Sequence, residues 1–150
     1  MRVLLDTNVL TRNAQPDHSQ HAPARDSVKQ LLERGNELCI GPQNLYEFWA
    51  VATRPLNENG LGLTPAQAQA ELARLKRWFT LLRDERGVLR EWEGLVATHD
   101  VKGKTAHDAR LVAAMQRHGL DRLLTFNASH FARFHAVTVL TPEGVLRVRT

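Results

Sequence analysis

Val3-Leu4-Leu5-Asp6-Thr7-Asn8 opens the chain with a short apolar run that ends at an acid. Such a run is typical of a strand that is buried on both faces of a parallel sheet. Thr7 and Asn8 then begin a turn. The carboxylate of Asp6 is costly at this place unless it is paired or faces a polar crevice. Two interpretations therefore stay open, a functional acid and a helix N-cap, since Asp is a favoured cap residue.

Short strands and longer helices are expected to alternate along the rest of the chain. Apolar runs and helical periodicity predict strands at 3–5, 37–40, 87–89, 122–125 and 136–140, and helices at 23–34, 42–53, 65–82, 91–101 and 106–118. The alternation predicts an α/β fold of three layers, in which a short parallel sheet of about five strands is flanked by helices. Ligands of such sheets bind beyond the carboxyl ends of the strands. Asp6 follows the first strand and Asn127 follows the fourth, so both are expected at this edge.

Length and composition are those of a globular protein. The 150 residues fit a single domain, 1–150, and the hydrophobic and charged fractions of 43% and 24% are ordinary. We expect no signal peptide and no membrane span, because no apolar stretch is long enough. Cys39 is the only cysteine, so no internal disulfide can form and a cytoplasmic location is expected. The formal net charge of +4 is compatible with a nucleic-acid partner without identifying one.

Glu47 lies in a nearly apolar helical segment, Asn44-Leu45-Tyr46-Glu47-Phe48-Trp49-Ala50-Val51. Helical geometry places Asn44, Glu47, Val51 and Arg54 on one face. An ion pair between Glu47 and Arg54 would have to span two turns, which is too far for direct contact. A bound metal would partner the carboxylate instead, and Glu47 is therefore a candidate ligand.

Asp108 stands in the first turn of the predicted helix 106–118. Interaction with the helix dipole would by itself account for an acid at this place. Its combination with Asp6 and Glu47 favours another interpretation, because all three acids can reach the same edge of one sheet. Neighbouring carboxylates repel and raise one another's pKa, and a divalent cation relieves that repulsion. Ligands that are all oxygen favour Mg²⁺ or Mn²⁺ over zinc.

Four segments, in order along nearly the whole chain, resemble those of PIN-domain nucleases. They are Leu4-Leu5-Asp6-Thr7-Asn8-Val9-Leu10, Leu45-Tyr46-Glu47-Phe48-Trp49 with Thr53-Arg54-Pro55, His107-Asp108-Ala109-Arg110-Leu111-Val112-Ala113, and Leu123-Leu124-Thr125-Phe126-Asn127-Ala128-Ser129-His130-Phe131. The likeness is strongest to the VapC-type toxins of bacterial toxin–antitoxin pairs. The resemblance implies a PIN-like fold and an endoribonuclease that depends on Mg²⁺ or Mn²⁺. It also implies a homodimer and a cognate VapB-type antitoxin that inserts into the active-site groove.

One position departs from the pattern of that family. The family often has a fourth acid after the fourth strand, where this chain has Asn127, and the later acidic position is His130. An amide oxygen can bind a metal but brings no charge to it. The departure argues against a tightly bound second metal.

The expected chemistry is metal-assisted hydrolysis of an RNA phosphodiester. Asp6 and Asp108 would anchor the metal, and Glu47 would bind it directly or through water. Asn127 would be a peripheral ligand or would hold a water molecule.

Polar and basic neighbours of the acids are expected to support this chemistry. Thr7, Asn8 and Thr125 are candidates to orient water or the carboxylates. RNA phosphates could be contacted by four basic residues, each with solvated surface charge as the alternative: Arg54, Lys102, Lys104 and Arg110.

Two other functions stay open. A phosphatase with Asp6 as its nucleophile would need a second Asp two residues later, where Asn8 stands. A catalytically weak PIN-like module that only binds RNA or an antitoxin is the other alternative, and Asn127 in place of an acid favours it. Loss of metal-dependent cleavage on changing Asp6 to Asn, with the fold retained, would separate the enzyme from both.

Overall fold

The computed structural model describes residues 1–148, and its centre is a parallel sheet of five strands. The strands are β1 (Arg2–Leu5), β2 (Glu37–Ile40), β3 (Thr80–Leu81), β4 (Arg122–Leu124) and β5 (Thr138–Leu140), in the spatial order β3-β2-β1-β4-β5. The chain adds β2 and β3 on one side of β1 and then returns to add β4 and β5 on the other. The direction of winding therefore reverses between β1 and β4.

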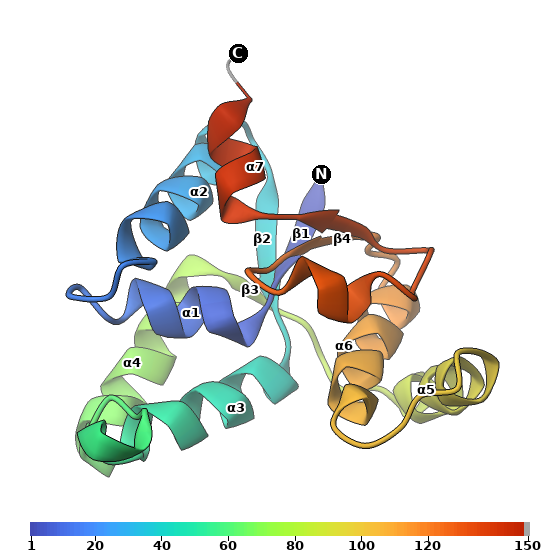
Figure 1. Cartoon of the computed structure of the whole chain (residues 1–150), viewed down its shortest axis with the longest axis horizontal. Helices are drawn as coiled ribbons and strands as arrows, with labels where there is room; N and C mark the ends of the chain where they lie inside the picture. The colour runs from blue at the N-terminus through green and yellow to red at the C-terminus, as the bar shows by residue number, and fades with distance from the viewer. Residues whose placement is uncertain (149–150) are drawn as a thin grey trace.

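Helices cover both faces of this sheet. They are α1 (Thr7–Asn13), α2 (His21–Glu33), α3 (Pro42–Thr53), α4 (Pro65–Trp78), α5 (Arg86–Thr98), α6 (Thr105–Arg117) and α7 (Pro142–Arg147), with 3-10 turns η1 (Leu56–Glu58) and η2 (Ala128–Phe131). Figure 1 shows α5 and α6 together on one side of the strands and the other α-helices on the opposite side. Within residues 1–148, no helix has the length and apolar character needed to cross a membrane.

Side chains of each central strand alternate between two apolar cores. Val3 and Leu5 pack into the core formed with α1, α2, α3, α4 and α7, whereas Leu4 packs into the core formed with α5 and α6. All three side chains are at most 1% exposed, as expected for a strand with helices on both faces. The prediction of a three-layer α/β fold with a short parallel sheet is thus confirmed.

The predicted strand at 87–89 is wrong, because these residues lie in α5. Val88, Trp92 and Leu95 recur at the spacing of one helix face and pack in the core against α6. Because this helical periodicity continues through the short apolar run at 87–89, these residues form part of the helix and not a strand.

The third strand lies instead in a segment that was predicted to be helical. The helix α4 ends at Trp78, and the next residues pair with β2, so that Thr80 lies opposite Cys39. The amide of Leu82 donates to the carbonyl oxygen of Ile40 at 2.8 Å. Neither Gly nor Pro marks this helix end, and the free edge of β2 provides the competing hydrogen bonds.

Two short helices were not predicted. The helix α1 begins immediately after Asp6, where a turn was expected. The helix α7 begins at Pro142, and the hydroxyl of Thr141 accepts a hydrogen bond from the amide of Gly144. A capping Thr followed by Pro is the same start signal that occurs at Thr64, so the sequence did contain evidence for α7.

Candidate active site

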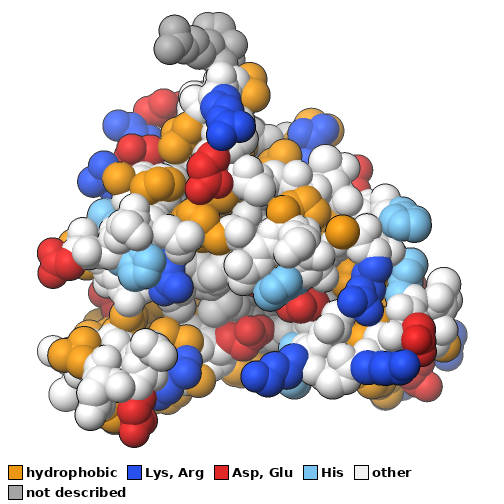
Figure 2. Space-filling model, viewed as in Figure 1, with side chains coloured by type: hydrophobic (Ala, Val, Ile, Leu, Met, Phe, Trp, Pro, Cys, Tyr) orange, Lys and Arg blue, Asp and Glu red, His pale blue; other side chains and the backbone are white. Residues whose placement is uncertain are grey.

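A pocket of about 330 Å³ lies at the carboxyl edge of the sheet, and three acids that are distant in the sequence line it. Asp6 follows β1, Glu47 lies in α3, and Asp108 lies in the first turn of α6. In the view of Figure 2, acidic side chains lie near the centre of the molecule, over the region where α1, α3 and α6 meet in Figure 1. Basic side chains lie on either side of them. The pocket lies where the winding of the sheet reverses, which is the usual place for a ligand in parallel α/β sheets.

Asp6 has two roles in the local structure. It is the N-cap of α1, and its Oδ1 accepts a hydrogen bond from the amide of Thr7 at 2.8 Å. Its Oδ2 accepts one from the hydroxyl of Thr125 at 2.7 Å and a longer one from the side-chain amide of Asn8 at 3.4 Å. The cap and the pocket acid are therefore the same side chain, and the two interpretations of Asp6 do not exclude each other.

Thr125 orients Asp6 by a hydrogen bond without lining the pocket itself. Its side chain is completely buried, and its Oγ1 also accepts hydrogen bonds from the side-chain amide of Asn8 at 3.2 Å and from the backbone amide of Asn127 at 3.0 Å. The hydroxyl thus joins the end of β1 to the segment after β4. Thr125 does not itself line the pocket, so any effect that it has on the site passes through its neighbours.

Two amide side chains in the first turn of α3 connect this helix to the helices that carry the other parts of the pocket. The Nε2 of Gln43 donates to the carbonyl oxygen of His107 at 2.8 Å, and its Oε1 accepts from Arg110 at 3.0 Å. The Nδ2 of Asn44, which is fully buried, donates to the Oγ1 of Thr7 at 3.2 Å. These bonds tie α3 to both α6 and α1. Sequence reasoning missed the role of Gln43, although a polar residue in so apolar a helix was a usable signal.

The electrostatics of the pocket disfavour three ionised acids. The pKa values of Asp6, Glu47 and Asp108 are all raised, and partial loss of hydration is the largest cause for each. The charge of Asp6 further raises the pKa of the other two acids. The hydrogen bond from Thr125 and the charge of His130 act in the opposite direction on Asp6 and lower its pKa.

The donor set of the pocket fits a hard divalent cation, because it consists of mutually repelling carboxylates. In the described residues 1–148, no three side chains of His, Cys, Asp or Glu are grouped closely enough to hold one ion between them. The three acids surround the pocket instead of meeting at one point. Mg²⁺ commonly takes only one or two carboxylates and keeps several waters, so this spacing suits an ion that is partly bound through water.

The structure places some of the remaining predicted residues in the pocket lining and others outside it. Thr7, Asn8, Arg54 and Asn127 line the pocket together with the three acids. The three other basic candidates, Lys102, Lys104 and Arg110, are not part of its lining. The pocket also includes His130, which stands at the later acidic position of the family pattern, and residues that the sequence did not single out as site residues: Thr11, Arg12, Val51 and Asn59.

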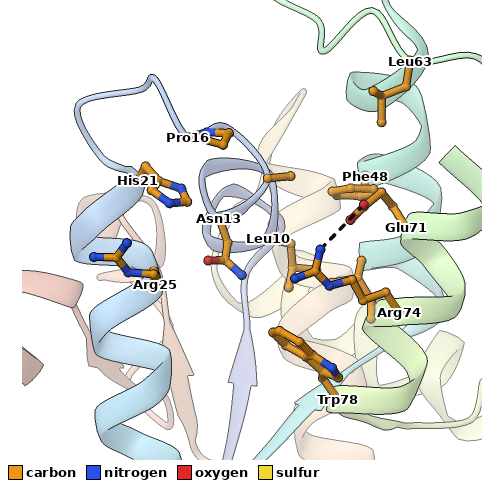
Figure 3. A pocket seen from close by; sticks show the side chains of 12 residues that line it. Leu10, Asn13, Pro16, His21, Arg25, Phe48, Leu63, Glu71, Arg74 and Trp78 are labelled. Atoms are coloured by element: carbon orange, nitrogen blue, oxygen red, sulfur yellow. Dashed lines mark ion pairs between the residues drawn. The ribbon is translucent and has the colours of Figure 1, made fainter. Parts of the chain in front are cut away.

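A larger cavity of about 480 Å³ lies on the other side of α1 and has different chemistry. Figure 3 shows its lining, where Glu71 pairs with Arg74 at 3.9 Å and the guanidinium of Arg74 lies 4.7 Å from the ring centre of Trp78. Glu71 is the single acid among the lining residues, and it is already paired. We therefore take the smaller pocket, with its three carboxylates, as the candidate active site.

Fold and pocket together define a class of three-layer α/β proteins that place carboxylates at the carboxyl edge of a parallel sheet. The model of the PIN domain family matches residues 3–136. The chain belongs to the PIN domain family.

Individual relatives extend over almost the full chain. The ribonuclease VapC24 of Mycobacterium tuberculosis is 28% identical over 145 residues, which cover 92% of this chain and 94% of the relative. The solved structure of VapBC2 from Rickettsia felis, bound to a promoter DNA fragment, matches with a TM-score of 0.72 and 14% identity, covering 94% of this chain and 98% of that one. The toxin VapC20 of M. tuberculosis, which cleaves the sarcin–ricin loop, matches with a TM-score of 0.65 and 18% identity, covering 87% and 93%. The structural matches show the common fold.

Proposed function

We propose that this chain is a divalent-metal-dependent endoribonuclease that hydrolyses RNA phosphodiester bonds, with residues 1–150 acting as a single PIN domain. The observation that carries the proposal is the placement of Asp6, Glu47 and Asp108 around one pocket at the carboxyl edge of the sheet. Membership of the PIN domain family and the likeness to a ribonuclease support it.

The metal would be Mg²⁺ or Mn²⁺. Asp6 and Asp108 would hold it, and Glu47 would contact it directly or through water. When bound, such an ion supplies Lewis acidity, which favours ionisation of water and offsets the negative charge of a phosphate. The raised pKa values of the three acids support this assignment, because burial and the neighbouring acids disfavour their ionised forms and a bound cation would offset both effects.

Other residues of the chain would prepare the carboxylates and the substrate. Thr125 and the amide of Thr7 fix the orientation of Asp6 through hydrogen bonds to both of its oxygens. Asn127 would hold water or a substrate oxygen at the pocket wall through its uncharged amide. Arg54, which is exposed on that wall, would contact an RNA phosphate.

We further propose that the protein is the toxin of a VapBC pair, a homodimer that acts in the cytoplasm. The proposal draws on the solved relatives, which include VapBC2 of R. felis and a toxin–antitoxin complex from Klebsiella pneumoniae, with a TM-score of 0.63 and 21% identity. A VapB-type antitoxin that covers the pocket should co-purify with the chain and suppress its nuclease activity. Light scattering of the purified chain measures whether it is a dimer.

The test of the nuclease is cleavage of RNA by the purified chain with Mn²⁺ or Mg²⁺, and with EDTA. We expect cleavage only with metal, and a loss of at least about 100-fold in the variants Asp6→Asn and Asp108→Asn. Asp17→Asn is the matched control, because Asp17 is exposed and outside the pocket. Binding of Mn²⁺, followed by calorimetry, should weaken in the two pocket variants and stay unchanged in the control.

Each alternative function has its own outcome. Cleavage that is equal in wild type and Asp6→Asn would refute the proposed site. Metal and RNA binding without any cleavage would favour the binding module. A phosphorylated aspartate trapped at Asp6 would favour the phosphatase, although Asn8 stands where that chemistry needs a second acid.

A further inference from the structure

Arg12 lines the carboxylate pocket but is not paired with any of its acids. It lies in the last turn of α1, is half-buried, and is part of the same lining as Asp6, Glu47 and Asp108. In the described part of the chain it forms no ion pair. Arg12 therefore does not neutralise the pocket acids by pairing with them, and its place in the lining needs another explanation.

Neutral side chains hold Arg12 in place. Its Nε donates to the Oε1 of Gln20 at 3.0 Å, and its Nη1 donates to the Oε1 of Gln15 at 2.8 Å. The ring nitrogen Nδ1 of His21 lies 3.1 Å from the carbonyl oxygen of Arg12, which ties the start of α2 to the same residue. The guanidinium is thus fixed in direction while its positive charge is left uncompensated.

Several other arginines of the chain are arranged differently. Each of them pairs with a carboxylate on the surface: Arg25 with Asp26, Arg74 with Glu71, Arg110 with Asp84, and Arg117 with Glu85. A guanidinium has five N–H donors, and Arg12 uses two of them in hydrogen bonds to residues of the described chain. The remaining donors and the full charge can serve an anion that enters the pocket.

The place of Arg12 along α1 indicates which anion this is. Asp6 caps the start of α1 and Arg12 lies six residues later, about 9 Å along the helix axis at the usual rise per residue. At this separation the carboxylates can hold the scissile phosphate through a metal while the guanidinium holds a neighbouring phosphate of the same RNA strand. Guanidinium groups bind phosphate oxygens through paired N–H donors.

We propose that Arg12 is a phosphate-binding residue that takes the RNA phosphate flanking the scissile one, and that Gln15 and Gln20 position it. The inference rests on the proposed nuclease function. It assigns to α1 two parts of one site, the acid Asp6 at its start and the substrate-binding cation near its end.

The test measures RNA binding and cleavage separately. Binding of a short fluorescent single-stranded RNA is measured by anisotropy over a range of salt concentrations, in the cleavage-deficient Asp108→Asn background with Mn²⁺ present. We expect Arg12→Gln to weaken binding roughly tenfold and to lower the slope of log affinity against log salt by about 0.7, the value for one phosphate contact on a single strand. Arg90→Gln, an exposed arginine of α5, is the control with the same change of charge.

Two conservative variants separate binding from a structural role. Arg12→Lys should keep the salt slope while losing part of the affinity, because the charge stays and the paired donors are lost. Gln20→Ala should weaken binding by a smaller factor without changing the slope. In the cleavage-competent protein, Arg12→Gln should raise KM and leave kcat within about twofold, as expected for a contact made equally in substrate and transition state.

Three results would overturn the inference. If the wild type cleaves RNA while Arg12→Gln and Arg90→Gln have the same affinity and salt slope, Arg12 is not a phosphate-binding residue and the nuclease stands. If the wild type neither binds nor cleaves RNA, the inference falls together with the proposed function. A loss of affinity in Arg12→Gln that Arg12→Lys does not partly restore, with a lowered melting temperature in both, would assign Arg12 a structural role only.

Discussion

The hydroxyl of Thr125 offers the sharpest test of how the pocket is built. The substitution Thr125→Val keeps the shape of this fully buried side chain and removes a single oxygen. That oxygen donates to Asp6 at 2.7 Å and accepts from Asn8 and from the amide of Asn127. Thr125→Ser is the matched control, because it keeps the hydroxyl and loses only a methyl group.

The expected cost follows from these contacts. A hydrogen bond to a charged group contributes about 1.5–3 kcal/mol, and the two donors that lose their acceptor add a smaller amount because water can reach the pocket. We expect Thr125→Val to lower the free energy of unfolding by about 2–4 kcal/mol at neutral pH. For a chain of this length that corresponds to a fall in Tm of roughly 5–15 °C. Thr125→Ser should cost about 1 kcal/mol, for the lost methyl group.

The pH dependence distinguishes this hydrogen bond from simple packing. The bond from Thr125 lowers the pKa of Asp6, so its removal raises that pKa further. A carboxyl group with a raised folded-state pKa destabilises the protein once pH exceeds the unfolded value of about 3.9, and the full cost is present above the folded pKa. The stability gap between wild type and Thr125→Val should therefore be smallest near pH 4 and widen towards pH 7.

The assay is urea unfolding in EDTA at several pH values, with Tm from scanning calorimetry. Equal losses in the valine and serine variants, or a gap that does not change with pH, would refute the assignment of the Thr125 hydroxyl to the charge of Asp6. Metal-dependent RNA cleavage should fall in the valine variant and be largely retained in the serine variant.

Three further predictions concern the pocket and the loop beside it. In EDTA at neutral pH, where the acids repel one another, Asp108→Asn should raise Tm by about 2–4 °C. Mn²⁺ should stabilise the wild type more than this variant. A variant that is destabilised in EDTA would contradict the electrostatic reasoning. Gln43→Ala should lower kcat roughly tenfold, because it cuts the link between α3 and α6, and the exposed Gln69→Ala should not; equal rates would contradict this role. A Cβ at Gly60 would lie 2.1 Å from the carbonyl oxygen of Arg54, so Gly60→Ala should lower stability by about 1–3 kcal/mol. Gly94→Ala, which meets nothing within 4 Å, should instead leave stability equal or raise it by up to about 1 kcal/mol in urea unfolding.

Local sequence patterns predicted the structure correctly where it depends on the burial of one continuous strand or helix. The apolar run before Asp6 predicted a strand covered on both faces, and Val3, Leu4 and Leu5 are indeed at most 1% exposed. The helix predicted at 42–53 has the bounds of α3, because Pro42 starts it and Pro55 follows its end. The placement of Asp6 after a strand and of Asp108 in the first turn of a helix followed from the same alternation.

Partners that are distant in sequence were decided only by the tertiary structure. The helix α4 stops at Trp78 because the edge of β2 offers hydrogen bonds to Thr80 and Leu81, which no local pattern reveals. The link from Gln43 to the first turn of α6 likewise depends on how two helices are set by the sheet.

Sequence by itself predicted the fold class, because periodicity and burial are properties of neighbouring residues. It also singled out the three acids that line one pocket in the structure. Tertiary structure alone decided which cations share their pocket: Arg12 and Arg54 line it, whereas Lys102, Lys104 and Arg110 do not. The physical reason is that the direction of a long flexible side chain is set by the groups that it meets, such as the two glutamines around Arg12, and these are known only when the helices are in place.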